Sequence, residues 1–238
     1  MPRWLERIPL VHLALAGVLL FGARPAEAAA SIWLQKGVSG FGTSVGVAYT
    51  AGWSGRTNNL NLTLGGGYSY KGVLELDLEV DRTFPVTDPQ TGASISSWSI
   101  GPHLEVHPLK QSATMPISLG LSAGIAFPFY SSSELDAQGI SVSAFGYSFG
   151  LMVYRFFRLG EWVGVTPAAG LSFSRVNVTF ETPTGSVDGG QSTLSGGFGA
   201  YFAFLDPGGR IWGVAPSLAI ADDCVQFQLQ VGVVFAMP

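Results

Sequence analysis

Apolar and polar side chains alternate along most of this chain, most regularly in two consecutive segments, residues 59–70 and 72–81. The second segment alternates Leu74, Leu76, Leu78 and Val80 with Glu75, Asp77, Glu79 and Asp81. A period of two residues is that of a β-strand with one apolar and one polar face. Each segment has about the length of a tilted strand that crosses the hydrocarbon of a bilayer. The pair therefore predicts a hairpin of two transmembrane strands, joined by a tight turn at residues 69–72.

The same period recurs toward the C-terminus and predicts ten strands in all. They cover residues 38–50, 59–70, 72–81, 97–107, 117–129, 141–156, 162–180, 193–204, 211–220 and 225–235. Between them we expect loops at 51–56, 82–94, 130–139 and 181–191, and turns at 69–72, 108–115, 158–160 and 206–209. Short turns at one end and longer loops at the other are typical of antiparallel transmembrane β-barrels, which have an even number of strands. The connection at 221–223 is too short for this alternation, so eight strands are the alternative.

Two strands depart from strict alternation. Pro102 falls on an apolar position of the strand at 97–107, where its missing N–H removes one ladder hydrogen bond and predicts a bulge. In the strand at 162–180, the apolar side chains change from odd to even positions near Ser174. That change predicts either a bulge or a strand that projects beyond the membrane.

Composition and the N-terminus agree with an exported barrel. Charged residues are 12% of the chain, about half of the usual share of roughly 25%, yet no apolar run reaches about 18 residues, the length of a membrane-spanning helix. Arg3 and Arg7 precede an apolar stretch at 8–21, and the small residues Ala26 and Ala28 follow it. These features predict a signal peptide at residues 1–28 and a barrel domain at 29–238, with an uncleaved anchor helix as the alternative.

Net charge and cysteine content argue against a nucleic-acid-binding protein, a disulfide-stabilised domain and a cysteine-dependent enzyme. The formal net charge of −4 disfavours nucleic acid as a partner. Cys224 is the single cysteine, so it cannot form an intramolecular disulfide, and a closed barrel would have to stabilise the chain instead. No histidine lies near Cys224 in the sequence, which disfavours a catalytic role for it.

Aromatic side chains gather near the ends of strands that the short turns connect: Tyr68, Tyr70, Phe156, Phe157, Trp162, Phe202, Phe204, Trp212 and Phe235. Such a girdle marks a membrane interface. From about residue 38 to Phe235 the pattern resembles the small outer-membrane β-barrel proteins of diderm bacteria, although Phe235 is followed by three residues instead of being terminal. The resemblance implies outer-membrane lipid and the barrel-assembly machinery as partners. That family includes pores, adhesins, structural proteins and lipid-modifying enzymes, so the resemblance selects no single function, and it leaves the oligomeric state open.

If the leucines face lipid, five carboxylates line the interior: Glu75, Asp77, Glu79, Asp81 and Glu105. Carboxylates this close must pair, bind cations or stay protonated. One interpretation is a cation-favouring lumen or ion site, with Arg175 as the best candidate for an inward-facing base. The alternative is a polar network with Asn59, Asn61 and water that fills a barrel too small to conduct.

A metal site is a second candidate. His103, Glu105 and His107 share one face of their strand, where neighbours two residues apart are separated by roughly 6.6 Å. The two histidines, roughly 13 Å apart, could not share one ion on a straight strand. A metal would therefore need a ligand from the strand at 72–81, such as Glu75 or Asp77. An ordinary hydrogen-bond network among these side chains is the alternative.

Two further functional classes are open. A lipid-modifying hydrolase would need Ser97 or Ser99 with His103 and Glu79, but the sequence has no Gly-x-Ser-x-Gly setting around these serines. A soluble lipocalin-like barrel would place the leucines inside and the carboxylates outside. We therefore predict a non-enzymatic, porin-like protein of the bacterial outer membrane without a cofactor, either a narrow cation-favouring pore or a structural or surface barrel.

Overall fold

The computed structural model describes residues 43–54, 59–87, 94–206, 208–221 and 224–237. The predicted signal peptide at 1–28 and the first residues of the strand predicted at 38–50 lie outside these ranges. Both therefore stay predictions.

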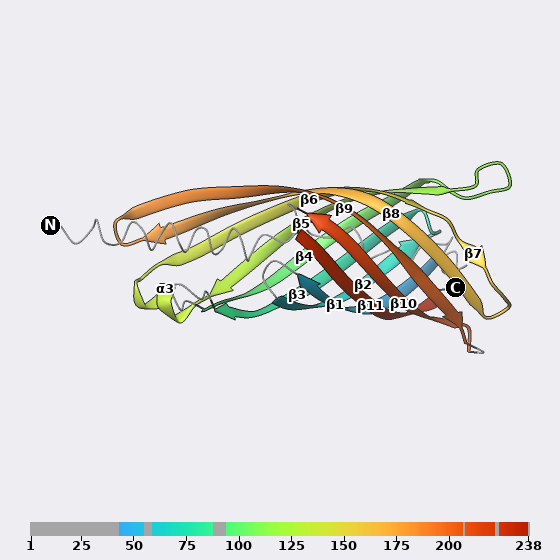
Figure 1. Ribbon diagram of the computed structural model, residues 1–238, viewed down its shortest axis with the longest axis horizontal. Coiled ribbons are helices and arrows are strands. Elements are labelled where there is room, and N and C mark those ends of the chain that lie inside the picture. The colour runs from blue at the N-terminus through green and yellow to red at the C-terminus, as the bar shows by residue number, and fades with distance from the viewer. Residues whose placement is uncertain (1–42, 55–58, 88–93, 207, 222–223, 238) are drawn as a thin grey trace.

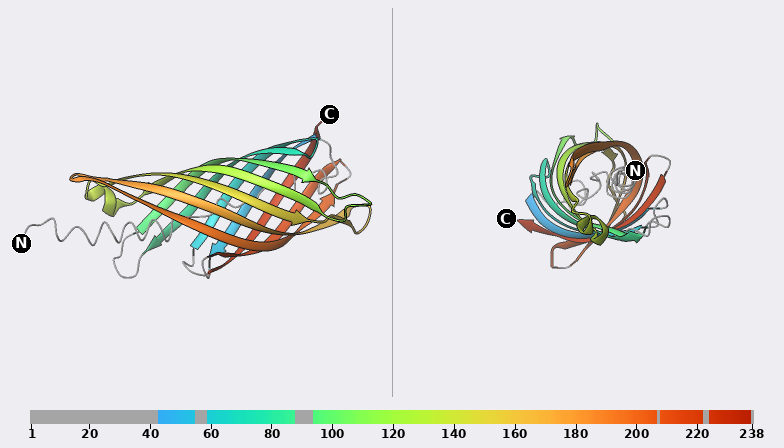
Figure 2. Two further views of the ribbon diagram at one scale, coloured as in Figure 1. Left: turned by 90° about the horizontal axis from the view of Figure 1, so that it is seen from above. Right: turned by 90° about the vertical axis from the view of Figure 1, so that its left-hand side faces the viewer.

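Ten long antiparallel strands close into one barrel in the described part of the chain, as the end-on view in Figure 2 shows. They are β1 (Thr43–Ser54), β2 (Asn59–Tyr70), β3 (Leu74–Thr87), β4 (Ser94–Leu109), β5 (Ser118–Ser131), β6 (Ser141–Tyr154), β8 (Val163–Thr182), β9 (Gly185–Leu205), β10 (Arg210–Ala221) and β11 (Cys224–Met237). A short helix, α3 (Ser133–Ala137), and a two-residue strand, β7 (Phe157–Arg158), lie in connections. Each long strand pairs with its sequence neighbours, β1 pairs with β11, and β6 pairs with β8 to close the barrel. The ten-strand prediction is confirmed and the eight-strand alternative is wrong.

The alternation of side chains sets which face of each strand meets the lipid. On β3, Leu76 is 53% exposed on the outer surface, whereas its neighbour Glu75 is fully buried inside. Closing the sheet pairs the backbone groups of every long strand, which is what a membrane requires of β-structure. The leucines lie outside and the carboxylates inside, so the lipocalin-like alternative is wrong.

The two ends of the barrel differ (Figure 1). One end, here called the turn end, carries the turn at 71–73, the connection between β9 and β10, and the C-terminal end of β11. The opposite loop end carries α3 and the tip of the β8–β9 hairpin, where Thr182 pairs with Gly185. No helix of the described residues is both long enough and apolar enough to cross a membrane.

Several predicted loops are strand instead. β1 continues to Ser54, β3 continues to Thr87, and β9 already begins at Gly185. These extensions contain glycine, threonine and polar residues on both faces, so they lack the alternation that marked the membrane-crossing parts. These extensions are strand because their backbone pairs with a long neighbouring strand. The pattern within one strand does not predict this pairing.

The predicted bulge at Pro102 is wrong. Leu78 pairs with Pro102 without interruption on one side, and on the other side the register at Ile100 and Phe127 is the same as at His103 and Gly124. Pro102 is exposed on the outer face, where the ladder continues past its missing donor. The register instead shifts nearer the strand ends, between Thr83 and Val86 and between Val106 and Leu109.

The change of parity on β8 does not come from a bulge. Its pairing with β6 keeps one register from Glu181 to Ala168, so even-numbered residues face inward throughout. Val176, Val178 and Phe180 are therefore buried inside the loop end, where Leu135 and Ile140 from the α3 connection pack against them. β8 and β9 are 20 and 21 residues long, and β9 continues past β10, whose last residue Ala221 pairs with Ser195. A projection of β8 beyond the membrane, the second alternative, stays a prediction.

Two sequence assignments change as a result. Arg175 shares the outer face of β8 and is exposed, so it is not the inward base that the sequence suggested. Phe156 is half-buried against Gly164, which lies on the inner face of β8 next to Thr166, so it does not belong to the outer aromatic girdle. The other eight girdle residues are exposed at the turn end: Tyr68, Tyr70, Phe157, Trp162, Phe202, Phe204, Trp212 and Phe235.

Candidate functional site in the barrel interior

The inner faces of β3 and β4 carry the predicted site residues. Their antiparallel register places Glu75 opposite Glu105, Asp77 opposite His103, and Asp81 opposite Ser99. Because alternate residues share a face, all five predicted carboxylates fall on the inner parity of these two strands. The structure divides them into a packed group near the turn end and an open group along a cavity.

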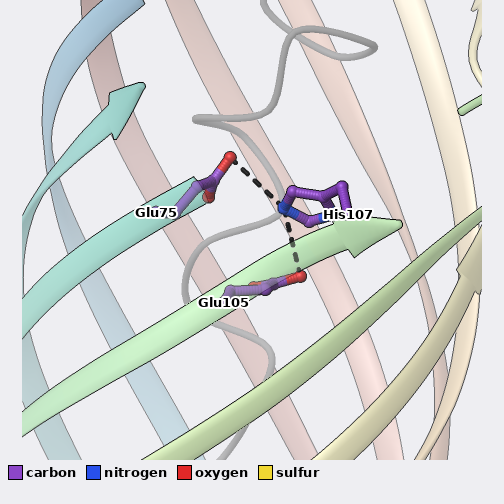
Figure 3. Close-up of side chains that lie close together, drawn as sticks. All are labelled: Glu75, Glu105 and His107. Atoms are coloured by element: carbon purple, nitrogen blue, oxygen red, sulfur yellow. Dashed lines mark ion pairs between the residues drawn. The ribbon is translucent and has the colours of Figure 1, made fainter. Parts of the chain in front are cut away.

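Glu75, Glu105 and His107 form the packed group (Figure 3). The Nε2 atom of His107 lies 3.4 Å from Glu75 Oε1 and 3.6 Å from Glu105 Oε1. The side chains of Glu75 and His107 are completely buried, and that of Glu105 is 2% exposed. This arrangement, which is hereafter called the EEH cluster, brings one nitrogen and two carboxylate oxygens together within 4.8 Å.

Neighbouring strands hold the EEH cluster in place. The backbone N–H of His107 donates to the carbonyl of Val73 in the β2–β3 turn at 2.9 Å. This bond fixes the backbone position from which the imidazole side chain extends. The Ser69 hydroxyl donates to Glu75 Oε1 at 3.4 Å. The Tyr154 hydroxyl lies 3.4 Å from His107 Nδ1, and the two rings meet edge to face.

Gly120 of β5 leaves the room that this cluster needs. A Cβ atom at Gly120 would lie 2.7 Å from Glu105 Oε1 and 3.2 Å from His107 Nδ1. Any larger residue at this position would therefore displace the carboxylate or the imidazole.

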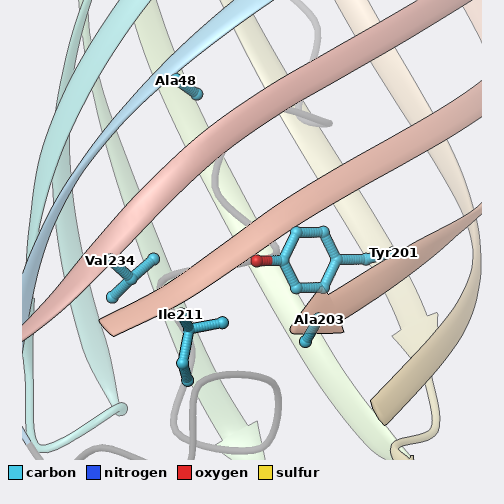
Figure 4. Close-up of a cluster of buried hydrophobic side chains, with 5 residues drawn as sticks. All are labelled: Ala48, Tyr201, Ala203, Ile211 and Val234. Atoms are coloured by element: carbon cyan, nitrogen blue, oxygen red, sulfur yellow. The ribbon is translucent and has the colours of Figure 1, made fainter. Parts of the chain in front are cut away.

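An apolar group, also near the turn end, packs inside the barrel on other strands (Figure 4). It consists of Ala48, Tyr201, Ala203, Ile211 and Val234 from β1, β9, β10 and β11. The ring of Tyr201 crosses Gly213, where an added Cβ would lie 2.0 Å from the Tyr201 hydroxyl oxygen. Together with the EEH cluster, this group makes the turn end of the interior densely packed.

A water-accessible cavity of about 190 Å³ occupies the interior, and all ten long strands contribute to its lining. On one side it meets Glu79, Asp81 and His103, with His103 Nε2 lying 3.4 Å from Glu79 Oε2. Thr63 donates a hydrogen bond to Asp81. Opposite them, β8, β9 and β10 contribute mainly glycine, alanine and serine. Among the described residues that line this cavity there is no lysine or arginine.

The structure places the predicted site residues of β3 and β4 in different parts of the interior. His103 and His107 lie in different groups, as their spacing along a straight strand predicted. Ser99 and His103 both line the cavity but are four residues apart on β4, roughly 13 Å of extended chain. Asp77 is half-buried between the two groups.

Sequence reasoning missed two parts of the site. One is Tyr154, which is the one tyrosine among the inward-facing residues of β6. Its position on the inner face is the signal in the sequence that could have found it. The other is Gly120, which had no signal of its own because a glycine's role depends on what crosses it in three dimensions.

Comparisons with known proteins add little beyond the architecture. No protein-family model matches the sequence, and no curated protein matches it. Among solved structures, the translocator domain of the autotransporter NalP from Neisseria meningitidis is 13% identical, with a TM-score of 0.47 over 82% of this chain and 88% of that chain. OprG from Pseudomonas aeruginosa is 12% identical, with a TM-score of 0.39 over 83% and 97%. Ail from Yersinia pestis is 13% identical, with a TM-score of 0.33 over 81% and 96%. Similarities this low say nothing about the activity of this chain.

The outer surface and the interior decide the class. The closed sheet presents an apolar belt with aromatic side chains at the turn end, and its polar side chains face inward. The molecule is an outer-membrane β-barrel. Its site residues therefore lie inside a barrel that lipid surrounds.

Proposed function

We propose that this outer-membrane barrel is non-enzymatic and that its lumen is a narrow passage that favours small cations. The observation that carries the proposal is the charge of the cavity wall. Glu79 and Asp81 face the cavity together with His103, and no lysine or arginine of the described residues lines it.

An excess of carboxylates in the cavity wall affects which ions enter it. Low-dielectric walls concentrate the field of fixed charges, so carboxylates in a confined lumen attract cations and repel anions. The small residues of β8, β9 and β10 leave space opposite the carboxylates. The packed turn end, with the EEH cluster and Tyr201, would be the narrowest part of the passage.

The geometry favours this function over a hydrolase. A nucleophile and its base must lie within hydrogen-bond distance of each other, and the spacing of Ser99 and His103 along β4 is far greater. These residues also face the interior instead of the lipid rim, where a lipid substrate would lie.

Planar-bilayer recordings test the proposal. The detergent-purified protein, its folding verified by a heat-dependent gel shift, should give discrete steps whose reversal potential in a salt gradient favours cations. The double variant Glu79→Gln/Asp81→Asn should move the reversal potential toward zero. Asp188→Asn, which removes an exposed carboxylate on the β8–β9 hairpin, is the matched control and should change nothing.

Two results would contradict the proposal. An unchanged cation preference in the folded double variant would show that the cavity carboxylates do not set selectivity. Absence of conductance from folded protein would mean a filled interior and a structural or surface role.

A further inference from the structure

We propose that the EEH cluster of Glu75, Glu105 and His107 binds one divalent transition-metal ion, with Zn²⁺ the best match. The site would hold whether or not the lumen conducts, because its donors come from β3 and β4 alone. Two carboxylates and one imidazole form a donor set that zinc accepts. Mg²⁺ and Ca²⁺ prefer sites made of oxygen only, so the histidine favours a transition metal.

Two of the three distances between donor atoms fit a tetrahedral ion, and the third, between the two carboxylate oxygens, is within 4.8 Å. With metal–ligand bonds of about 2.0–2.1 Å, two ligands at a tetrahedral angle are separated by about 3.3 Å. His107 Nε2 lies 3.4 Å from Glu75 Oε1 and 3.6 Å from Glu105 Oε1, close to this value. Three protein donors would leave a fourth position for water.

The two carboxylates of the cluster are placed where they repel each other when both are charged. Glu75 and Glu105 are directly opposite each other on paired strands, an arrangement in which like charges destabilise a sheet. Both side chains are buried, and carboxylates repel each other more strongly in the protein interior than in water. A divalent cation between them would attract both carboxylates and remove this repulsion.

His107 is oriented as a ligand. Its Nε2 atom is buried, points at the two carboxylates in Figure 3, and makes no hydrogen bond to the described residues. The Oε2 atom of Glu75 is likewise buried without such a bond. The opposite ring nitrogen faces the Tyr154 hydroxyl, and metal-binding histidines are held in this way by a partner on their second nitrogen.

Metal titration of the full-length folded protein tests the site. After treatment with a chelator, calorimetry should detect one equivalent of Zn²⁺, and Co²⁺ should give the strong visible absorption of a four-coordinate ion. His107→Gln and Glu105→Gln should each weaken Zn²⁺ binding by at least about 100-fold. Tyr154→Phe keeps all three ligands and should weaken it by about 10-fold, as loss of a ligand's partner does.

Two variants serve as controls, and conductance is not needed for the readout. Glu181→Gln removes an exposed carboxylate from β8 and should bind Zn²⁺ normally. His103→Gln removes the other interior histidine and should leave the stoichiometry at one. Absence of Zn²⁺ binding by the folded wild-type protein, or equal binding by folded His107→Gln, would overturn the proposal. If a variant does not fold, the Co²⁺ spectrum of the wild-type protein still decides, because an octahedral aqueous spectrum excludes the site.

Discussion

At the scale of single residues, glycines determine which large side chains the narrow interior can hold. Gly120 gives space to Glu105 and His107, and Gly213 gives space to the ring of Tyr201. An interior this small is filled by a few large groups, each of which needs a residue without a side chain beside it. The glycine content of this chain is therefore partly a packing requirement of the lumen.

Gly213→Ala tests this requirement. The new Cβ would overlap the Tyr201 ring, so the ring must move, and we expect a loss of about 1–3 kcal/mol in the free energy of unfolding. Urea unfolding in lipid vesicles, followed by tryptophan fluorescence, measures the change. Gly160→Ala is the matched control, because nothing lies within 4 Å of its added Cβ.

A second substitution separates overlap from other effects. In a Tyr201→Ala background, Gly213→Ala should cost much less, since the overlapping ring is absent. Equal costs in both backgrounds would show that the Tyr201 contact is not the cause.

At the scale of elements, the tight turns fix register at the turn end. Lys71 and Gly72 both have positive φ angles, 54° and 56°, and Val73 N–H donates to the Tyr70 carbonyl at 3.0 Å. Positive φ at both central residues is the pattern of a type I′ hairpin turn. This turn sets the pairing of β2 with β3, and through it the inward direction of Glu75.

The β9–β10 turn relies on a side chain instead. Desolvation raises the pKa of Asp206, but hydrogen bonds from the backbone N–H groups of Arg210 and Gly208 and from the side chains of Trp212 and Arg210 outweigh it and lower the pKa. The carboxylate therefore stays charged and holds the turn.

Substitution of Lys71 tests the cost of the hairpin turn. Lysine already bears part of the strain of positive φ, and Lys71→Ile adds the strain of a β-branched residue there, so it should destabilise the barrel by about 1 kcal/mol. Lys71→Gly, which removes the same side chain but accepts positive φ, should be close to neutral. Equal losses in the two variants, measured by urea unfolding, would assign the effect to the lost lysine contacts and contradict the backbone explanation.

The β8 strand marks where the lipid ends. Leu171 and Phe173 are exposed and apolar on its outer face, whereas Arg175 and Asn177 continue that face as polar side chains. On the inner face the order reverses, from serine to the buried Val176 and Val178. We infer that the membrane boundary lies near Ser174 and that the rest of the β8–β9 hairpin stands in water, closed by the α3 connection.

Spin labels on β8 measure this boundary. In a Cys224→Ser background, which removes the single cysteine, a label at Leu171→Cys should be relaxed mainly by oxygen dissolved in lipid. A label at Asn177→Cys, on the same face, should respond mainly to a water-soluble nickel complex. The same oxygen preference at both positions would place the boundary farther along the hairpin.

At the scale of the whole molecule, closure is what gives the interior its character. The pairing of β1 with β11 and of β6 with β8 gives every long strand a hydrogen-bonded neighbour on each side and encloses the acidic wall. A carboxylate on an open sheet would be solvated and unremarkable. The same carboxylate inside a barrel faces a confined cavity and its own neighbours, so cation preference and metal binding both depend on closure.

The sequence by itself determined the class of fold and the direction of its side chains. Strict alternation in β3 separated Leu76 from Glu75, because a strand's period of two is a local property. The same local rule assigned all five carboxylates to the interior and separated His103 from His107. It did not give the full length of β8 and β9, whose ends are ordered by pairing instead of by their own pattern.

Only the tertiary structure decided which interior groups meet. The position of Tyr154 against His107, of Gly120 against Glu105 and of Arg175 on the outer face depends on register between strands distant in sequence. A shift of one residue on β8 would have reversed the faces of Arg175 and Val176, and no local pattern specifies which register wins. Registers are set by the closure of all ten strands together, which is why the site could be expected from the sequence but its geometry could not.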